Sequence, residues 1–244
     1  MPFTPAHPAI VLPFLKWKRL SATALVIGSM APDFEYFFKL SVSSTHSHTV
    51  GGIFYFDVPV VIVLSVLFHQ VVKHNLFANL PVFFQQRFYD TRSLDFRVYL
   101  RKHPFSFLAS AIIGAASHLF WDAFTHNSGY FARNLWFYKG TAIPFEGVNY
   151  PLFYALQHIS TIVGLITVAC YIYFREPEQQ AIVTRPSIVY WLVLVLIAAV
   201  VVFIRFTIYP ADYNLGNVVV SSISGLCLAL VINGMFRFRS ITTA

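Results

Sequence analysis

Long apolar runs separated by short polar segments make up most of the chain. Five of these runs are long enough to cross a bilayer, whose hydrocarbon core needs roughly 20 helical residues. We expect each run to form a membrane-spanning helix, so the pattern predicts an all-α, polytopic membrane helix bundle. The expected spans are Val50–Val72, Pro104–Thr125, Pro151–Phe174, Ser187–Tyr209 and Leu215–Phe236.

The opening segment contains two shorter apolar stretches, residues 6–15 and 20–31, on either side of the basic cluster Lys16–Arg19. Each stretch has about half of the roughly 20 residues that a span needs, so we expect a re-entrant or interfacial helical hairpin. One tilted span with buried charge is the alternative. A cleavable signal peptide is not expected, because the basic cluster follows the first apolar stretch instead of preceding it.

The composition is also typical of a membrane protein. The 244 residues are 57% hydrophobic and 11% charged, whereas soluble domains carry roughly 25% charged residues. We expect a single integral membrane domain, in which residues 1–49 form the hairpin and a metal-site segment, residues 50–174 the first three spans, and residues 187–236 the last two. Cys170 and Cys227 lie within apolar runs, which favours packing over a disulfide or a thiolate metal site.

The net charge of +7 does not indicate nucleic-acid binding, because the basic residues gather in loops beside the spans. The loop 73–103 is the most basic, and further arginines follow the last span. The positive-inside rule then predicts that this loop and the C-terminus are cytoplasmic, with membrane lipids as sufficient partners. Leu94 and Val98 indicate a partly helical segment of this loop on the inner surface. The basic residues are Lys73, Arg87, Arg92, Arg97, Arg101, Lys102, Arg237 and Arg239.

The second span ends with three polar residues four apart, His118, Asp122 and His126. This spacing puts all three on one helix face, and ionisable residues within a span usually face an interior site. His118 and Asp122 can share a metal ion, but His118 and His126 are about 12 Å apart along the axis. His126 therefore serves a second ion, supports a ligand or contacts the substrate. A polar packing seam, in which His118 and Asp122 simply pair, is the alternative.

Other histidines and a carboxylate fall on the same predicted outer side of the membrane. His7 opens the hairpin, Asp33 ends it, and His46 and His48 precede the first span. In an extended or loop segment, His46 and His48 would point to the same side. With the pair on the second span, these residues provide ligands for one or two ions, and a metal pair about 3.5–4 Å apart suits phosphoester displacement. Nitrogen and carboxylate ligands without thiolate favour zinc, manganese or iron.

Three further residues are candidates for the site. Glu35 follows shortly after the hairpin and is either a general base or a carboxylate that supports a ligand. Asp57, inside the first span, precedes Pro59, where a break in the helix would turn the carboxylate toward the bundle interior. His158 lies in the third span, and a core histidine bonded to its neighbours is the alternative there.

The order of these motifs resembles that of the DUF4184 membrane proteins of bacteria, over essentially the whole chain. More distantly, it is similar to that of LexA-regulated, metal-dependent hydrolases of the bacterial inner membrane and, in ligand type, to zinc-dependent phospholipase C. The chain departs from the distant pattern at Glu35, where aspartate is frequent. The motifs are Met1–Ala9, Gly28–Glu35, Thr45–Thr49 and, most specific, Ser117–His126. The resemblance implies a hydrolase whose metal ligands are His7, Asp33, His46 or His48, His118 and Asp122.

The sequence therefore predicts a metal-dependent hydrolase at the outer face of the membrane. Its substrate would be a phosphoester or other ester in an amphiphilic, lipid-linked or envelope molecule. We expect zinc to lower the pKa of a bound water and Glu35 or His126 to move protons. A non-enzymatic protein with a structural metal is the first alternative. A metal or proton transporter is the second, and it is disfavoured because the inner halves of the spans carry no matching carboxylates.

Overall fold

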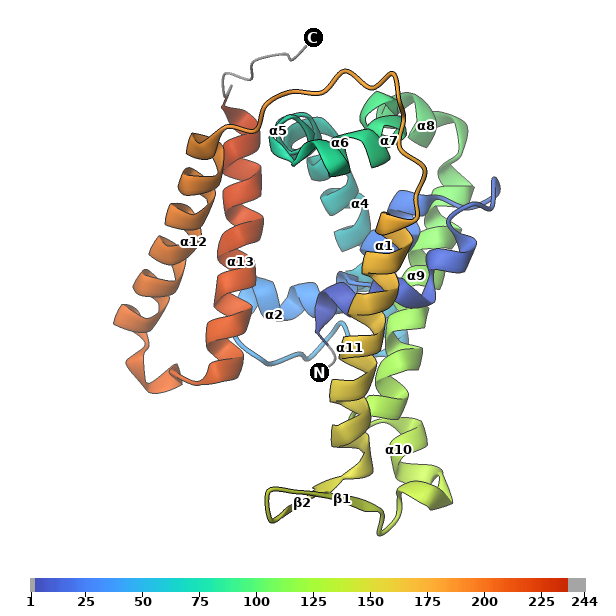
Figure 1. Cartoon of the computed structure of the whole chain (residues 1–244). Coiled ribbons are helices and arrows are strands. Elements are labelled where there is room, and N and C mark those ends of the chain that lie inside the picture. The colour runs from blue at the N-terminus through green and yellow to red at the C-terminus, as the bar shows by residue number, and fades with distance from the viewer. Residues whose placement is uncertain (1–2, 237–244) are drawn as a thin grey trace. The chain divides into compact units, whose positions relative to one another are not determined.

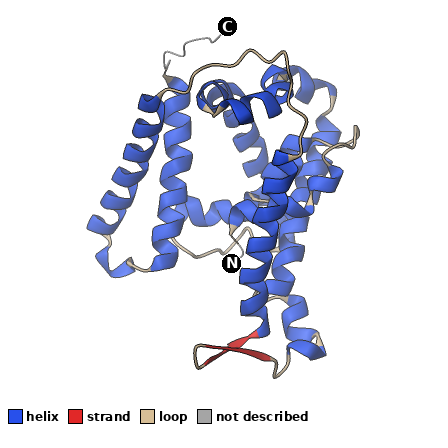
Figure 2. Ribbon diagram, viewed as in Figure 1, coloured by secondary structure: helices blue, strands red, loops and turns tan. Residues whose placement is uncertain are grey.

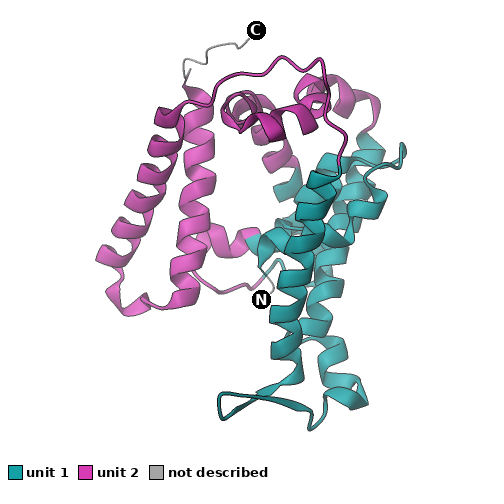
Figure 3. Ribbon diagram, viewed as in Figure 1, with its two compact units in different colours: residues 1–33, 46–61, 104–174 teal, residues 34–45, 62–103, 175–244 magenta. Residues whose placement is uncertain are grey.

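The computed structural model describes residues 3–236, and these form two compact units (Figure 3). Unit 1 contains residues 1–33, 46–61 and 104–174, and unit 2 contains residues 34–45, 62–103 and 175–244. Both units therefore combine segments that are distant in the sequence. The expected single domain stays a prediction. The C-terminus, with Arg237 and Arg239, lies outside the described residues.

Five helices are long and apolar enough to cross a membrane, which confirms the predicted all-α bundle (Figures 1 and 2). Each corresponds to one predicted span, and the first two extend further along the chain than expected. By length and composition the five are Val50–Asn79, Pro104–Asn134, Leu152–Tyr173, Ile188–Ile208 and Leu215–Met235.

The N-terminal segment of unit 1 folds into short helical turns, in agreement with its two short apolar stretches. It consists of the 3-10 helices η1 (Thr4–Ile10) and η2 (Leu12–Phe14), the helix α1 (Ala22–Gly28) and the 3-10 turn η3 (Ala31–Asp33). Ala6 of η1 lies directly against Gly164 of α11 (Leu152–Tyr173), since a Cβ on Gly164 would come within 2.8 Å of the Ala6 Cβ. The depth of this segment in a membrane stays a prediction.

The helix α9 (Pro104–Thr125) contacts α1 along a face of small residues. A Cβ on Gly114 would lie 2.6 Å from the Leu25 carbonyl oxygen, and one on Gly28 would lie 2.8 Å from the Ala111 carbonyl oxygen. Small residues at such positions allow helix backbones to approach closely. The same face of α9 continues into His118, one turn beyond Gly114. The close approach of the two helices therefore determines which groups at the end of α1 lie beside His118.

The first span is one long helix that passes from unit 1 into unit 2 and contains two π-helical turns. Pro59 cannot donate a backbone hydrogen bond, and the π turn just before it accommodates this without breaking the helix. The break predicted at Pro59 is thus a π turn, and Asp57 at its end is fully buried. The parts in order are α3 (Val50–Gly52), η4 (Ile53–Asp57), α4 (Val58–Leu67), η5 (Phe68–Val72) and α5 (Lys73–Asn79).

The connection between α9 and α11 in unit 1 contains a β-hairpin that the hydrophobic pattern does not predict. Strands β1 (Ala142–Phe145) and β2 (Val148–Pro151) pair antiparallel, with Phe145 opposite Val148. The two residues between them, Glu146 and Gly147, both have positive φ, as a two-residue hairpin turn requires. The short helices α10 (Tyr130–Asn134) and η6 (Trp136–Tyr138) precede the hairpin.

Unit 2 is built around the antiparallel helices α12 (Ile188–Ile208) and α13 (Leu215–Met235). Their backbones approach at Gly225, where a Cβ would lie 2.8 Å from the Ala198 Cα. The basic loop 73–103 is largely helical, as expected. The remaining elements of the unit are α2 (Phe34–Lys39), α6 (Val82–Arg87), α7 (Tyr89–Ser93), α8 (Phe96–Lys102) and η7 (Pro210–Asp212).

Candidate metal centre

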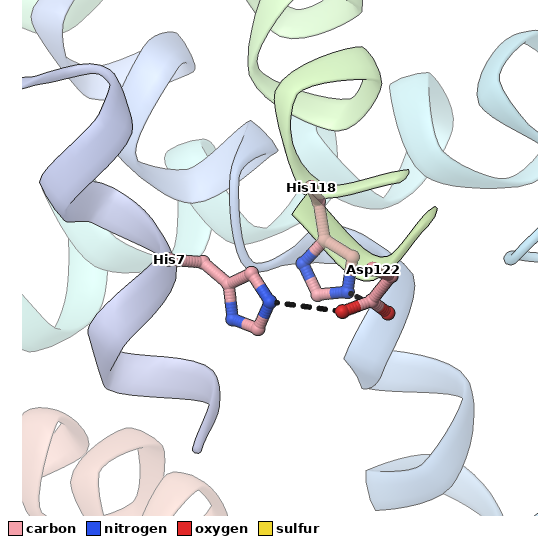
Figure 4. A group of neighbouring side chains, drawn as sticks. All are labelled: His7, His118 and Asp122. Atoms are coloured by element: carbon pink, nitrogen blue, oxygen red, sulfur yellow. Dashed lines mark hydrogen bonds and ion pairs between the residues drawn. The ribbon is translucent and has the colours of Figure 1, made fainter. Parts of the chain in front are cut away.

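Imidazole and carboxylate groups from four separate segments converge within unit 1. The α9 helix provides two of them, and η1, η3 and the turn before α3 provide one each. Two overlapping groups of three could each hold a metal ion, since one ligand atom from each member lies within 4.8 Å of the others. The groups are His7, His118 and Asp122 (Figure 4), and Asp33, His48 and His118.

His118 is oriented by a backbone carbonyl of the α1–η3 connection. Its Nδ1 lies 2.8 Å from the Ser29 carbonyl oxygen, and because a carbonyl can only accept, Nδ1 carries the proton and donates. In the neutral imidazole, the lone pair is then on Nε2. A histidine that ligates a metal typically has its other nitrogen bonded in this way, which fixes both tautomer and ring orientation.

The Nε2 atom of His118 faces two carboxylates. It lies 3.3 Å from Asp122 Oδ2 and 3.6 Å from Asp33 Oδ1. All three atoms are buried, and none has a hydrogen-bond partner among the described residues. Buried polar atoms are rarely left in this state, and lone pairs that face one another repel unless a cation lies between them. A metal ion between these atoms would satisfy them, and so would a proton on His118 Nε2, as in the paired seam that is the alternative.

His48 adds a second imidazole beside the two carboxylates. Its Nε2 lies 3.5 Å from Asp33 Oδ1 and 3.6 Å from Asp122 Oδ2. Zinc–nitrogen bonds of roughly 2.0–2.1 Å in a tetrahedral site place ligand atoms about 3.3–3.4 Å apart. The separations of 3.3–3.6 Å between histidine nitrogens and carboxylate oxygens are close to this spacing, and each group of three could hold one ion. They are too long for good hydrogen bonds between the same atoms.

The second oxygen of Asp122 faces two other histidines. Asp122 Oδ1 lies 3.4 Å from His7 Nε2 and 3.4 Å from His126 Nδ1. The His7 ring stacks on the His118 ring with 3.8 Å between centroids. Asp122 thus links two sets of imidazoles through its two oxygens, as a carboxylate bridging two ions does, so His7 and His126 are candidates for a second ion.

The protonation states of His7 and Asp33 suit metal binding. Burial lowers the pKa of His7, and the neighbouring His118 lowers it further. For Asp33, burial alone would raise the pKa, but the attraction of the neighbouring histidines and the hydrogen bond from Thr4 outweigh it, so the pKa lies below its usual range. A neutral imidazole and an ionised carboxylate are the states that bind a metal.

Three supporting residues were not predicted from the sequence. Thr4 Oγ1 donates to Asp33 Oδ2 at 2.5 Å, and Ser47 Oγ lies 2.9 Å from His48 Nδ1. Ser29 acts through its main chain alone. No spacing rule identifies such residues, although the small-residue sequence Gly28-Ser29 does indicate a close helix approach at this point.

Five predicted candidates lie outside the two groups of three: His126, which contacts Asp122, and the four residues that follow. His46 is exposed, with Nδ1 3.2 Å from the Tyr55 hydroxyl. Residues 45–49 form a loop of bends and a turn, which brings His48 into the cluster without His46. His158 is exposed against the Tyr154 ring, and Asp57 is buried in the π turn η4. Glu35 belongs to unit 2, where its Oε1 accepts from Lys39 Nζ, Thr45 N and Thr45 Oγ1.

The turn that presents His48 depends on a close contact. Thr49 Oγ1 accepts from the Gly52 N–H at 2.9 Å and donates to the His46 carbonyl at 2.8 Å. A Cβ on Gly52 would lie 2.0 Å from that carbonyl oxygen, so only glycine fits there. The capped turn fixes which of the two neighbouring histidines enters the cluster.

Comparison with known proteins identifies a family without an activity. Residues 1–235 match a family model that is described as a domain of unknown function (DUF4184). No curated protein and no solved structure matches the chain. The motif similarity to LexA-regulated hydrolases is not supported by a match, so any statement about function has to rest on the His/Asp cluster.

Proposed function

The chain belongs to the DUF4184 family, which has no assigned function, and we propose from the His/Asp cluster that it is a membrane-bound, metal-dependent hydrolase. The proposed substrate is a phosphoester or other ester in an amphiphilic or lipid-linked molecule. An ion would be held by His118 with Asp33 and His48, or by His118 with His7 and Asp122, and His126 would extend the site beside Asp122.

The observation that supports this proposal is the set of buried ligand atoms without hydrogen-bond partners at His118, Asp33 and Asp122. Their nitrogen and oxygen chemistry favours zinc, manganese or iron over metals that prefer thiolate. The cluster is buried on one side and accessible on the other, because the His48 and His126 side chains are 19% and 23% exposed whereas His118 is 0% exposed. Water and a polar substrate group can approach from this accessible side.

Each residue has a role that its contacts support. A divalent metal held here would lower the pKa of water and polarise the scissile group. His126 places Nδ1 between the main-chain and side-chain oxygens of Asp122, at 3.2 and 3.4 Å, and its buried Nε2 has no hydrogen-bond partner among the described residues. His126 can therefore accept or donate a proton at Nε2. Glu35 is the weaker candidate for this role, because its Oε1 already accepts three hydrogen bonds.

A structural metal site is the second candidate function. Four protein ligands close a structural zinc site, and the two overlapping groups contain five candidate ligand residues between them. In that case the ion would stabilise the contact of η3 and the His48 turn with α9, and no product would form. Both candidate functions predict bound metal, but only the hydrolase predicts product formation, so an activity measurement distinguishes them.

The location that we propose is a bacterial cytoplasmic membrane, with loop 73–103 inside and the cluster toward the outer face. The basic residues of that loop support this orientation. Cysteines placed at positions 46 and 90, with Cys170 and Cys227 replaced by serine, test it with a membrane-impermeant thiol reagent. Labelling of position 46 alone from outside is expected, and labelling of position 90 from outside would reverse the orientation.

A panel of phospholipids and isoprenoid phosphates tests the proposed hydrolysis. Purified full-length protein should release product from at least one of them, and a chelator should stop the reaction until metal is restored. His118→Ala and Asp33→Ala should both abolish product release. His158→Ala is the matched control, because this exposed histidine lies outside the cluster. Activity that survives in both cluster variants would exclude this site as the catalyst.

A further inference from the structure

A cavity of about 390 Å³ lies in unit 1 between η1, α9 and α11. This volume falls within the range of pockets that hold small molecules, roughly 300–1,000 Å³. Its lining is almost entirely apolar and largely aromatic or branched. The main lining residues are Ile10, Phe120, Trp121, Phe124, Ile159 and Val163, and we refer to this cavity as the Trp121 groove.

The Trp121 groove borders the metal cluster through two residues of α9. Trp121 and Thr125 line the groove and flank Asp122 in the sequence, one helical turn apart. The Trp121 ring lies 5.6 Å from the His7 ring, and Thr125 Oγ1 lies 3.4 Å from His126 Nδ1. The side chains of Trp121 and Thr125 therefore lie between the groove and the histidines His7 and His126.

The hydroxyl groups that line the groove already have partners. Thr125 Oγ1 donates to the Trp121 carbonyl, Ser160 Oγ to the Gln157 carbonyl, and the Tyr138 hydroxyl to the Phe124 carbonyl, at 3.3, 3.2 and 2.8 Å. Because these hydroxyl groups already donate to main-chain carbonyls, the groove presents a mainly apolar surface with few free hydrogen-bond donors. A polar ligand would lose its hydrogen bonds with water there, whereas a hydrocarbon chain would lose nothing.

The rim of the groove faces outward from helices that are long and apolar enough to cross a membrane. Phe120, Ile159 and Val163 are each more than half exposed while also lining the groove. A chain can therefore enter sideways from the bilayer. Entry itself gains little free energy, because lipid tails are as apolar as the groove, so the polar end held at the cluster decides which chain stays.

We propose that the Trp121 groove holds the hydrocarbon chain of the substrate, while the hydrolysable polar end lies at Asp122 and His126. This inference rests on the proposed hydrolase and narrows its substrate class to amphiphiles in which an ester or phosphoester is joined directly to a long chain. The groove then orients the substrate, and the cluster carries out the chemistry.

Photolabelling of the full-length protein tests this inference without requiring turnover. The probe is a phosphatidic acid with a diazirine in the middle of one acyl chain, at a low fraction in phosphatidylcholine vesicles. Label is expected to concentrate on Trp121, Ile159 and Val163. Ser160→Trp, which fills the groove with an indole ring, should remove most of it, and Val163→Phe should lower it several-fold.

The matched control is Ile162→Trp, which places the same indole on α11 at an exposed position outside the groove lining, and it should leave the labelling pattern unchanged. Metal content should be measured on every variant and should stay at the wild-type value. This control shows whether the cluster remains folded. Label spread evenly over the exposed positions of α9 and α11, or label in the groove that Ser160→Trp does not reduce, would overturn the inference. Groove-specific label on a protein that binds no metal would support the chain site and overturn the hydrolase proposal instead.

Discussion

Unit 1 and unit 2 each contain a cluster of buried polar side chains, around Asp122 and around Gln85, and the atoms of the two clusters are satisfied differently. In unit 2, Gln85 Nε2 donates to the Leu80 and Thr184 carbonyls at 2.7 Å each, and Gln85 Oε1 accepts from the Thr184 N–H at 2.9 Å. Asn79 likewise accepts from the Ser187 N–H at 2.9 Å. In unit 1, by contrast, Asp33 Oδ1, His118 Nε2 and Asp122 Oδ2 face one another without hydrogen bonds.

The difference separates a structural network from a ligand site. Donors and acceptors alternate around Gln85, so every polar atom of its amide is satisfied and the network holds loop segments together. Around Asp122 the atoms are mostly acceptors, and only a cation or added protons can satisfy them all. Burial of polar groups alone does not indicate a metal site, whereas convergence of buried acceptors without donors is the pattern expected of one.

Loss of the Asp122 carboxylate should have the largest effect on metal binding. Asp122→Asn keeps the shape of the side chain and removes the charge shared by both sets of histidines. Metal affinity should fall by more than the roughly 10–100-fold that loss of a supporting partner costs. Titration with a chromophoric chelator measures it, and Asp90→Asn, at a largely exposed carboxylate, should bind metal as the wild type does. Equal affinity in Asp122→Asn would remove Asp122 from the site.

A bulky substitution between α1 and α9 should have the second-largest effect on metal binding. Gly114→Val places methyl groups against the Leu25 carbonyl, which separates the helices and withdraws the Ser29 carbonyl from His118. Metal affinity should fall about tenfold or more. Gly225→Val creates a similar clash between α12 and α13 and should lower the thermal midpoint while leaving metal affinity unchanged. If both variants weaken metal binding equally, the effect is a general loss of folding.

Loss of a hydroxyl that supports a ligand should have a moderate effect. Thr4→Val removes the donor to Asp33 Oδ2 at nearly constant volume, so we expect metal affinity to fall roughly 10–100-fold. The control is Thr167→Val, whose hydroxyl donates to the Val163 carbonyl of its own helix. Chelator competition on the two purified variants measures the difference. A Thr4→Val protein with wild-type affinity would show that Asp33 needs no such support.

The network of unit 2 should contribute stability and nothing to the metal site. Gln85→Ala leaves the Thr184 N–H and two carbonyls without their partner, at a cost of about 1–3 kcal/mol in the free energy of unfolding. Thermal unfolding in detergent should detect this loss, while metal content per folded molecule stays at the wild-type value. A loss of metal in Gln85→Ala would show that the contrast drawn between the two networks is wrong.

The spans and the His118–Asp122 pair could be predicted because both depend on local spacing. The length of an apolar run can be read directly from the sequence and shows whether it can cross a bilayer. Residues four apart on a helix always share a face. The inclusion of His7 and Asp33 followed from the expected hairpin. The structure brings these residues to the cluster through the 3-10 turns η1 and η3.

The parts that could not be predicted depend on the tertiary fold. His48 enters the cluster and His46 does not, because Thr49 caps a turn there that alternation cannot reveal. The contact of the Ser29 carbonyl with His118 could not be predicted, because it is made by the main chain and does not depend on the residue type. Pro59 suggested a break, but a helix can accommodate a proline with a π turn. The β-hairpin at 142–151 shows no apolar alternation, because its strands are exposed.

Elemental analysis of the intact protein, purified without chelator, tests the central claim most directly. We predict about one or two equivalents of zinc, manganese or iron per chain, retained through gel filtration and lost in Asp122→Asn. Less than about one-tenth of an equivalent, with no uptake when metal is added, would contradict the claim, because the converging ligand atoms should bind a divalent ion tightly.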